Sequence, residues 1–259
     1  MPLADDLALA LELADAADRI SQARFGALDL AVETKPDLTP VTDADRAVEQ
    51  ALRDALAIAR PHDAIVGEEF GATADQLGRR WVIDPIDATK NFVRGVPVWA
   101  TLIALMDGDN VLVGVASAPA IAHRWWAARG LGSWTTRPGV AVRRNAVSGI
   151  TTVADASLSY SDLGDWGGAT QQFQRLAGSV WRTRAYGDFW SHLLVAEGAV
   201  DISAEPEISL WDVAALVVIV EEAGGRVTAI DGSASPAGSS IVCTNGALHD
   251  EVLLQLAAG

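Results

Sequence analysis

Residues 81 to 92, WVIDPIDATKNF, constrain the fold of this chain more than any other stretch. The segment starts as an apolar run typical of a buried strand and then places two acids three residues apart, Asp84 and Asp87. A buried carboxylate is costly unless it is paired or binds a metal. Because Pro85 cannot donate to a strand ladder, we expect the strand to break there and to bring both acids and a free carbonyl into one loop.

Three other short stretches place acids where strands or loops end. They are Gly67-Glu68-Glu69, Trp211-Asp212 and residues 41–45, VTDAD. Hard cations such as Mg²⁺ prefer oxygen ligands, and a pair of such ions can hold the attacking and leaving oxygens of a phosphoryl transfer. Carboxylates from separate segments therefore predict a site for divalent cations with phosphoryl-transfer chemistry.

Each acidic stretch also has a structural interpretation that the sequence leaves open. Glu68-Glu69 is compatible with an ordinary charged turn, and Asp87 with the N-cap of a helix that starts one residue later. Asp212 stands at the start of an apolar helix, where an acid favours the helix dipole. Thr42 and Asp45 fit a capping box.

The overall charge argues against a nucleic-acid partner. The net charge is −15 and the sequence pI is about 4.5, which disfavours a wide contact with a phosphate backbone. The only cysteine, Cys243, excludes an intramolecular disulfide, argues against a thiolate zinc site and suits a reducing compartment. The N-terminus is acidic, unlike a signal peptide, and the run AALVVIV is far shorter than the ~20 residues of a membrane span. We expect a soluble, cytoplasmic protein without a membrane partner.

The pattern of apolar residues predicts an α/β chain in two closely packed halves. Helical spacing is found in residues 3–25 and 43–60, and short β-like runs between residues 101 and 136 indicate an antiparallel meander. In the second half, strand-like and helix-like segments alternate, which is typical of layered α/β folds. We expect an N-terminal α+β subdomain over residues 1–147 and a C-terminal α/β subdomain over residues 148–259.

Taken together, the acidic stretches resemble the inositol monophosphatase family of Mg²⁺-dependent, Li⁺-sensitive phosphatases. The resemblance rests on Gly67-Glu68-Glu69, on residues 81–92 and on residues 211–215, WDVAA, in matching order and separation over nearly the whole chain. It implies a layered α-β-α-β-α sandwich, two to three Mg²⁺ ions in each active site, a small phosphate monoester as substrate and a homodimer.

The site residues of the family can be transferred to this sequence position by position. The metal ligands would be Glu68, Asp84, the carbonyl of Ile86, Asp87 and Asp212. Thr89 and Asp45 would orient and activate the attacking water, and Glu68 would complete the catalytic set beside a third, weaker Mg²⁺. The amides around Ala88 and Thr89 would hold the phosphate at a helix start. As in the family, water would attack phosphorus in line, without a phospho-enzyme.

Two segments are more similar to the histidinol-phosphatase branch of the family than to its inositol branch. They are residues 87–105, in which Lys90 precedes the run GVPVW, and residues 184–198. Asp188 and Glu205 would pair with the cationic end of histidinol phosphate. The resemblance implies Mg²⁺-dependent hydrolysis of L-histidinol phosphate to L-histidinol and phosphate, in histidine biosynthesis. An inositol-1-phosphate phosphatase of the same fold is the alternative.

Several further residues have open roles. The other predicted substrate contacts are Gly187, Asp212 and Arg184, and Asn245 is a candidate for the lining of the site. Arg184 fits a surface ion pair equally well, and Asp188 fits a helix N-cap. The four histidines show no metal-ligand spacing, and Trp125-Trp126 favours a dimer contact.

Ala88 is the one departure from the family pattern, which usually has glycine there. Glycine is the default residue for a strained or closely approached backbone position. If φ is negative at this position, alanine is nearly neutral. We therefore expect Ala88 to affect the fit of the phosphate and not the chemistry.

Overall fold

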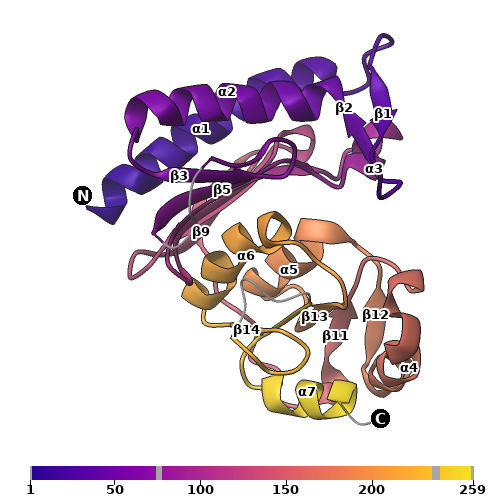
Figure 1. Cartoon of the computed structure of the whole chain (residues 1–259). Coiled ribbons are helices and arrows are strands. Elements are labelled where there is room, and N and C mark those ends of the chain that lie inside the picture. The colour runs from indigo at the N-terminus through magenta and orange to yellow at the C-terminus, as the bar shows by residue number, and fades with distance from the viewer. Residues whose placement is uncertain (1, 74–77, 235–239, 258–259) are drawn as a thin grey trace.

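The computed structural model describes residues 2–73, 78–234 and 240–257 and shows a layered α/β molecule. Figure 1 shows the layers in the order α-β-α-β-α, from α1 and α2 at the top to α7 at the bottom, which confirms the predicted sandwich. The helices are α1 Leu3–Arg24, α2 Asp43–Ala59, α3 Thr89–Val93, α4 Thr170–Ser179, α5 Asp188–Ala196, α6 Leu210–Glu222 and α7 His249–Ala257.

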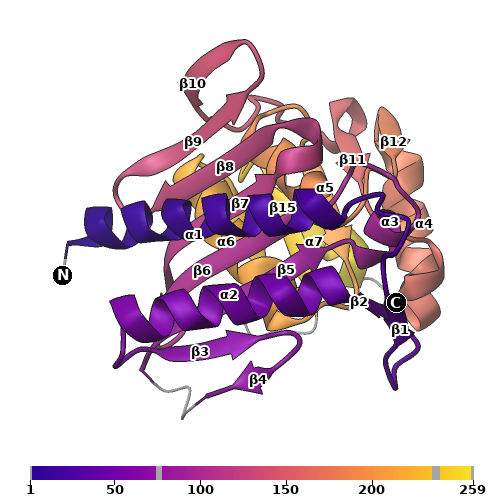
Figure 2. The ribbon, with the colours of Figure 1, turned by 90° about the horizontal axis from the view of Figure 1, so that it is seen from above.

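An eight-stranded sheet forms the first β-layer, in the order β10-β9-β8-β7-β6-β5-β3-β4. Its strands are β3 Ala64–Gly67, β4 Gly71–Ala72, β5 Arg79–Asp87, β6 Ala100–Asp107, β7 Asn110–Ala118, β8 His123–Ala128, β9 Gly132–Arg137 and β10 Val140–Arg144. Strands β5 to β10 pair antiparallel, which confirms the predicted meander, whereas β3 lies parallel to β5. The two predicted N-terminal helices, α1 and α2, cover one face of this sheet (Figure 2).

A five-stranded mixed sheet forms the second β-layer, in the order β12-β11-β13-β15-β14. Its strands are β11 Ser157–Ser159, β12 Arg182–Arg184, β13 Ile202–Glu205, β14 Arg226–Thr228 and β15 Ile241–Thr244. Apolar residues of α4 and α7 pack on one face of this sheet, and those of α5 and α6 pack on the other. A separate ribbon, β1 Val32–Thr34 and β2 Pro40–Thr42, leads into α2.

Helix α6 lies between the two sheets because it is apolar on nearly every side. Its sequence LWDVAALVVIVEE leaves Val213 to Val220 buried without a break. The helix approaches β7 so closely that a Cβ at Gly114 would lie 2.3 Å from the carbonyl oxygen of Ala215. Glycine is therefore required at this point of β7. The helix joins both sheets into one core and carries Asp212 in its first turn.

The expectation that Pro85 breaks the strand is wrong. Strand β5 continues to Asp87, and its register against β6 shifts between Asp84, which faces Leu102, and Asp87, which faces Ala100. One extra residue on β5 is thus accommodated as a β-bulge, which leaves a residue unpaired and bends the strand. A bulge re-aims side chains without ending the strand, so both acids remain anchored in the sheet.

The first sheet ends at Arg144 and the second begins at Ser157, and the connection between them contains only the short 3₁₀ helix Val153–Asp155. We propose that the subdomain boundary lies in this connection, near residue 147. No helix in the described ranges is both long and apolar enough to cross a bilayer.

Candidate active site

Three aspartates form an acidic cluster where β5 and α6 meet. Asp84 and Asp87 come from the bulge of β5, and Asp212 comes from the first turn of α6. One carboxylate oxygen from each residue lies within 4.8 Å of the others. Within the described ranges, this is the one such group of three or more potential metal ligands. Its oxygen donors suit a hard divalent cation.

Backbone amides orient the three carboxylates. Asp84 Oδ1 accepts the amide hydrogen of Ile86 at 3.0 Å, inside the bulge. Asp87 Oδ2 accepts the amide hydrogen of Phe189 at 2.9 Å, at the start of α5. Asp212 Oδ2 accepts the amide hydrogen of its own helix N-cap at 2.6 Å, which completes a capping box. These amide bonds use one oxygen of each carboxylate, so the second oxygen is left for a ligand.

The aspartates of this cluster resist ionisation together. Burial, and then the charges of Glu68 and Asp87, raise the pKa of Asp84 well above its ordinary value. Burial likewise raises the pKa of Asp212 to about 7. Crowded like charges in a buried place favour either protonation or a bound cation. The chemistry of this donor set therefore fits a divalent metal ion.

Lys35 contacts the two glutamates that follow β3. Its Nζ lies 2.6 Å from Oε1 of Glu68 and 2.5 Å from Oε1 of Glu69. Although burial disfavours the ammonium, hydrogen bonds to these two glutamates raise the pKa of Lys35 above its ordinary value. Glu68 thus lies beside the cluster, close enough for its charge to raise the pKa of Asp84, and a lysine holds it there. A single lysine in a polar loop gives no signal in the sequence.

Glu49 shapes the turn that carries Glu68, and sequence reasoning missed it. Its fully buried carboxylate accepts the amide hydrogens of Glu69 at 2.7 Å and of Phe70 at 3.1 Å. Gly67 makes room for it, because a Cβ at that position would lie 2.0 Å from Glu49 Oε1. The glycine of the Gly67-Glu68-Glu69 segment is therefore required by the packing of a buried acid.

The structure places Thr89 beside Asp45. Thr89 Oγ1 donates to the carbonyl of Ile86 at 2.9 Å and lies 3.3 Å from Asp45 Oδ1. The other oxygen of Asp45 accepts the amide and hydroxyl hydrogens of Thr42 at 2.8 and 2.6 Å. The predicted capping box at Thr42 is confirmed, and it leaves one oxygen of Asp45 facing Thr89.

The backbone conformation at Ala88 is left-handed, which differs from the negative φ at which alanine would be nearly neutral. Its φ is 67° and its ψ is 46°, so the condition under which alanine would be nearly neutral is not met. An L residue in this region costs roughly 1–2 kcal/mol. Ala88 is itself the N-cap of α3, which begins at Thr89, so Asp87 does not cap this helix. The amides of Asn91 and Phe92 donate to the carbonyl of Ala88, whereas the amides of Thr89 and Lys90 precede the first helical bonds and can meet an anion.

A second pair of acids, Asp188 and Glu205, comes from the second half of the chain. Asp188 is the first residue of α5 and has a φ of 48°, while Gly187 is the N-cap, so the N-cap interpretation of Asp188 is wrong. Ser161 joins the pair: its hydroxyl bonds to Glu205 Oε1 and accepts the amide hydrogen of Asp188 at 2.7 Å. Burial, followed by the charge of Glu205, raises the pKa of Asp188 to about 6. Burial, and then the charge of Asp188, raise the pKa of Asp87, and the amide next to Asp188 donates to Asp87, so this pair lies beside the aspartate cluster.

Three other sequence candidates have different surroundings. Arg184 is exposed, and its Nη1 donates to the carbonyl of the preceding residue at 2.7 Å, so its predicted substrate contact stays a prediction. Asn245 donates at 2.7 Å to the carbonyl of Ile150 and ties two loops together, and we do not assign it to the site. Trp125 is fully buried and donates to Glu197 at 2.7 Å, so it offers no surface for the expected dimer contact, whereas Trp126 is half-buried and its part in such a contact stays a prediction.

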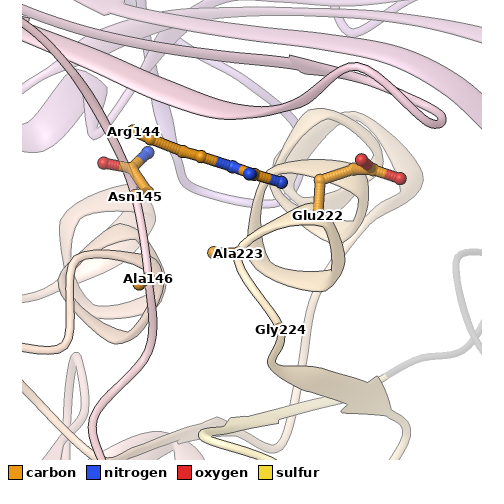
Figure 3. A pocket seen from close by; sticks show the side chains of 6 residues that line it. All are labelled: Arg144, Asn145, Ala146, Glu222, Ala223 and Gly224. Carbon is orange, nitrogen blue, oxygen red and sulfur yellow. The ribbon is translucent and has the colours of Figure 1, made fainter.

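A cavity of about 350 Å³ lies apart from these residues (Figure 3). It is lined by Arg144, Asn145, Ala146, Glu222, Ala223 and Gly224. In Figure 3 the side chain of Arg144 extends toward Glu222, whose carboxylate accepts the amide hydrogen of Gly132 at 2.9 Å. None of the lining residues belongs to the acidic cluster, and we assign no role in the reaction to this cavity.

Comparisons with known proteins are consistent with this arrangement. A model described as the inositol monophosphatase family matches residues 3–258. The chain is 58% identical to a histidinol-phosphatase of Mycobacterium tuberculosis over 98% of this chain and 99% of that protein. It is 55% identical to a histidinol-phosphatase of Streptomyces coelicolor over 96% of each. Among solved structures, the extragenic suppressor protein suhB of Bartonella henselae has a TM-score of 0.88 at 26% identity and covers 98% of this chain and 99% of that one.

Proposed function

The chain belongs to the inositol monophosphatase family, and from this premise we propose that it hydrolyses L-histidinol phosphate to L-histidinol and phosphate. The observation that carries the proposal is the 58% identity, over nearly the whole of both chains, to a histidinol-phosphatase. The reaction is a phosphate monoester hydrolysis and belongs to histidine biosynthesis.

Mg²⁺ is the cofactor in this proposal, with two to three ions in each active site. The residues that would hold the ions are Glu68, Asp84, Ile86 through its carbonyl, Asp87 and Asp212. When bound, the ions supply positive charge to the equatorial and leaving oxygens of the phosphate. The supporting observations are the close approach of three aspartate oxygens and the raised pKa values of Asp84 and Asp212.

The hydroxyl of Thr89 and the carboxylate of Asp45 prepare the attacking water. Because Thr89 donates its hydrogen to a neighbouring oxygen, the lone pairs of Oγ1 can accept a hydrogen bond from water. Burial raises the pKa of Asp45, which makes this carboxylate a better base for the proton that the water loses. For this step the Thr89 hydroxyl donates to Asp45 Oδ1, 3.3 Å away, and not to the carbonyl of Ile86, so Thr89 gives its own hydrogen to Asp45 as it takes one from the water. The amides around Ala88 and Thr89 hold the phosphate.

The carboxylates of Asp188 and Glu205 support histidinol phosphate as the substrate. Histidinol phosphate carries an ammonium and a titratable imidazole, and each can form a charge-assisted hydrogen bond with a carboxylate. A neutral polyol such as inositol gains much less from a second acid. The pair lies beside the aspartate cluster, as a contact to the other end of the same small substrate requires.

Two further parts of the proposal concern the state of the protein. A homodimer is implied by the family resemblance, and light scattering of the purified protein tests it. A cytoplasmic location suits the buried free thiol of Cys243, because free thiols persist in reducing compartments.

The deciding experiment compares substrates on the purified wild-type enzyme at saturating Mg²⁺. Phosphate release is measured from L-histidinol phosphate and, beside it, from inositol 1-phosphate. We expect kcat/KM to favour histidinol phosphate by at least about 100-fold, because the carboxylates of Asp188 and Glu205 bind a cationic group more tightly than a neutral polyol. A ratio that favours inositol 1-phosphate would overturn the proposal and support the alternative.

A further inference from the structure

His192 contacts the carboxylate that is proposed to bind the substrate, although its sequence position assigns it no role. It lies in α5, which packs against β13, the strand that ends at Glu205 (Figure 1). Its side chain is 2% exposed. Nε2 lies 3.3 Å from Glu205 Oε1, and Nδ1 lies 2.8 Å from Ser203 Oγ. Both ring nitrogens therefore have polar partners, and one partner is a site residue.

The two contacts of Glu205 fall on the same oxygen. Oε1 meets both the ring of His192 and the hydroxyl of Ser161. No bond to Oε2 is found within the described ranges. A carboxylate held at one oxygen presents the other in a fixed direction, which is what a charge-assisted bond to an ammonium or imidazolium requires. The hydroxyl of Ser161 also binds the amide of Asp188, so one network fixes both acids.

The hydrogen on Nε2 follows from the surroundings of the ring. Ser203 can donate to Nδ1 or accept from it, so Nε2 carries a hydrogen for Glu205 in the protonated ring and in one neutral tautomer. Burial disfavours a charge on the ring, yet the neighbouring Cys243 and Glu205 raise the pKa of His192 well above its ordinary value. In the protonated ring, and in the neutral tautomer with its hydrogen on Nε2, the ring donates toward Glu205.

We propose that His192 is a positioning residue for substrate specificity, which holds Glu205 so that Oε2 meets the cationic end of the substrate. The inference rests on the proposed function. It separates His192 from the phosphate chemistry, because none of its contacts named above is with the aspartate cluster or with Thr89. His192 therefore governs the binding of one end of the substrate and leaves hydrolysis at the other end unchanged.

The test compares two substrates on His192→Leu at saturating Mg²⁺. One is L-histidinol phosphate, and the other is p-nitrophenyl phosphate, which has no cationic end. We expect the KM for histidinol phosphate to rise about tenfold, the equivalent of one charge-assisted hydrogen bond, while kcat/KM for p-nitrophenyl phosphate changes less than about twofold. His192→Gln should recover part of the loss, because its amide nitrogen can still donate to Glu205.

A matched control is His249→Gln. His249 lies on α7, is also fully buried and is bonded to two threonine hydroxyls. We expect it to lower thermal stability without changing the ratio of the two substrates. If His192→Leu does not fold, Ser161→Ala tests the same network and should show the same substrate-selective loss. Equal losses on both substrates, or an unchanged KM for histidinol phosphate, would overturn the inference. A wild-type preference for inositol 1-phosphate would instead overturn the proposed function, in a measurement that involves no variant.

Discussion

Buried acids at two places in the molecule are neutralised in opposite ways. At the end of the first sheet, Asp6 of α1 is fully buried and lies 3.0 Å from Arg60 and 2.7 Å from Arg79. At the end of β5, Asp84 and its two aspartate neighbours face one another instead. An acid matched by arginines holds elements together, whereas acids that face one another need a cation from solution. The partner of a buried acid therefore distinguishes scaffold from site in this chain.

Two further buried acids extend the scaffold class. Glu197, at the end of α5, is paired with Arg137 and Arg143 of the β9–β10 hairpin. Glu49 is paired with Arg53 at 2.7 Å and also binds amides of the turn after β3. Glu49 is thus paired with an arginine, like the scaffold acids, and also supports the turn that carries Glu68, a proposed metal ligand. It is intermediate between the two classes.

The largest expected effect is on the site class. Asp87→Asn removes a proposed metal ligand, and we expect kcat to fall by about 10³-fold, because charge stabilisation in the transition state is lost. Unfolding without Mg²⁺ should occur at an equal or higher temperature, since one of the crowded charges is gone. Steady-state phosphate release and thermal melts in EDTA measure both. Asp250→Asn, at a largely exposed position, is the control, and a variant at Asp87 with wild-type kcat would refute the assignment.

A change at a scaffold acid should have the opposite result: the free energy of unfolding should fall, and kcat should stay nearly the same. Asp6→Asn removes the charged partner of Arg60 and one of the two charged partners of Arg79, which still pairs with Asp63, and we expect the free energy of unfolding to fall by about 3 kcal/mol. The kcat at 25 °C should stay within about twofold of wild type, because Asp6 is not part of the site. Chemical denaturation and the phosphatase assay test this together. A loss of kcat with unchanged stability would break the distinction between the two classes.

Removal of the metal should make stability depend on pH in a characteristic direction. Burial raises the pKa of Asp188 to about 6 and that of Asp212 to about 7, so the folded state binds more protons than the unfolded state between about pH 4 and 7. Without metal, stability therefore falls as pH rises through this window, by on the order of 4 kcal/mol between pH 5 and 8. Saturating Mg²⁺ should abolish or reverse the trend, because protons compete with the cation. Thermal melts in EDTA measure it, and Asp212→Asn should flatten the curve.

The smallest expected effect is that of a change at Glu49, the acid that is intermediate between the scaffold class and the site class. Glu49→Gln keeps an oxygen acceptor for one of the two turn amides, replaces the other oxygen with an NH₂ group and loses the charge that pairs with Arg53. We expect the Mg²⁺ concentration for half-maximal activity to rise about tenfold, as for other residues that support metal ligands, while the KM for histidinol phosphate stays constant. Titration of activity with Mg²⁺ measures it, with exposed Glu12→Gln as the control. A change in KM alone would place Glu49 outside the support of the metal site.

The sequence predicted the parts of this molecule that are local. The meander and the capping box at Thr42 follow from periodicity and a short motif, and the acids of the cluster stand in contiguous motifs. The order of the five layers was implied by the family resemblance. The supports of the site were not predictable, because Lys35, Glu49 and His192 acquire their roles through contacts between distant segments. None of the three differs in the sequence from an ordinary charged or buried residue.

Backbone geometry was the second limit. The sequence shows Pro85, but it does not show whether the strand ends there or continues through a bulge, since the answer depends on the partner strand. It shows Ala88 in place of glycine, but the sign of φ depends on how α3 is attached to β5. Both features are fixed by pairing and packing rather than by residue preference.

The position of α6 between the two sheets has a consequence for the order in which the enzyme folds and becomes active. Asp84 and Asp212 lie in different halves of the chain, and they meet only after α6 has docked on the meander that carries β5. Contacts between such distant segments form late, because the entropy of closing a long loop must be overcome first. During refolding, recovery of phosphatase activity therefore marks the last docking step, after helical signal has returned. A nascent chain cannot hydrolyse its substrate until both halves have been made and joined.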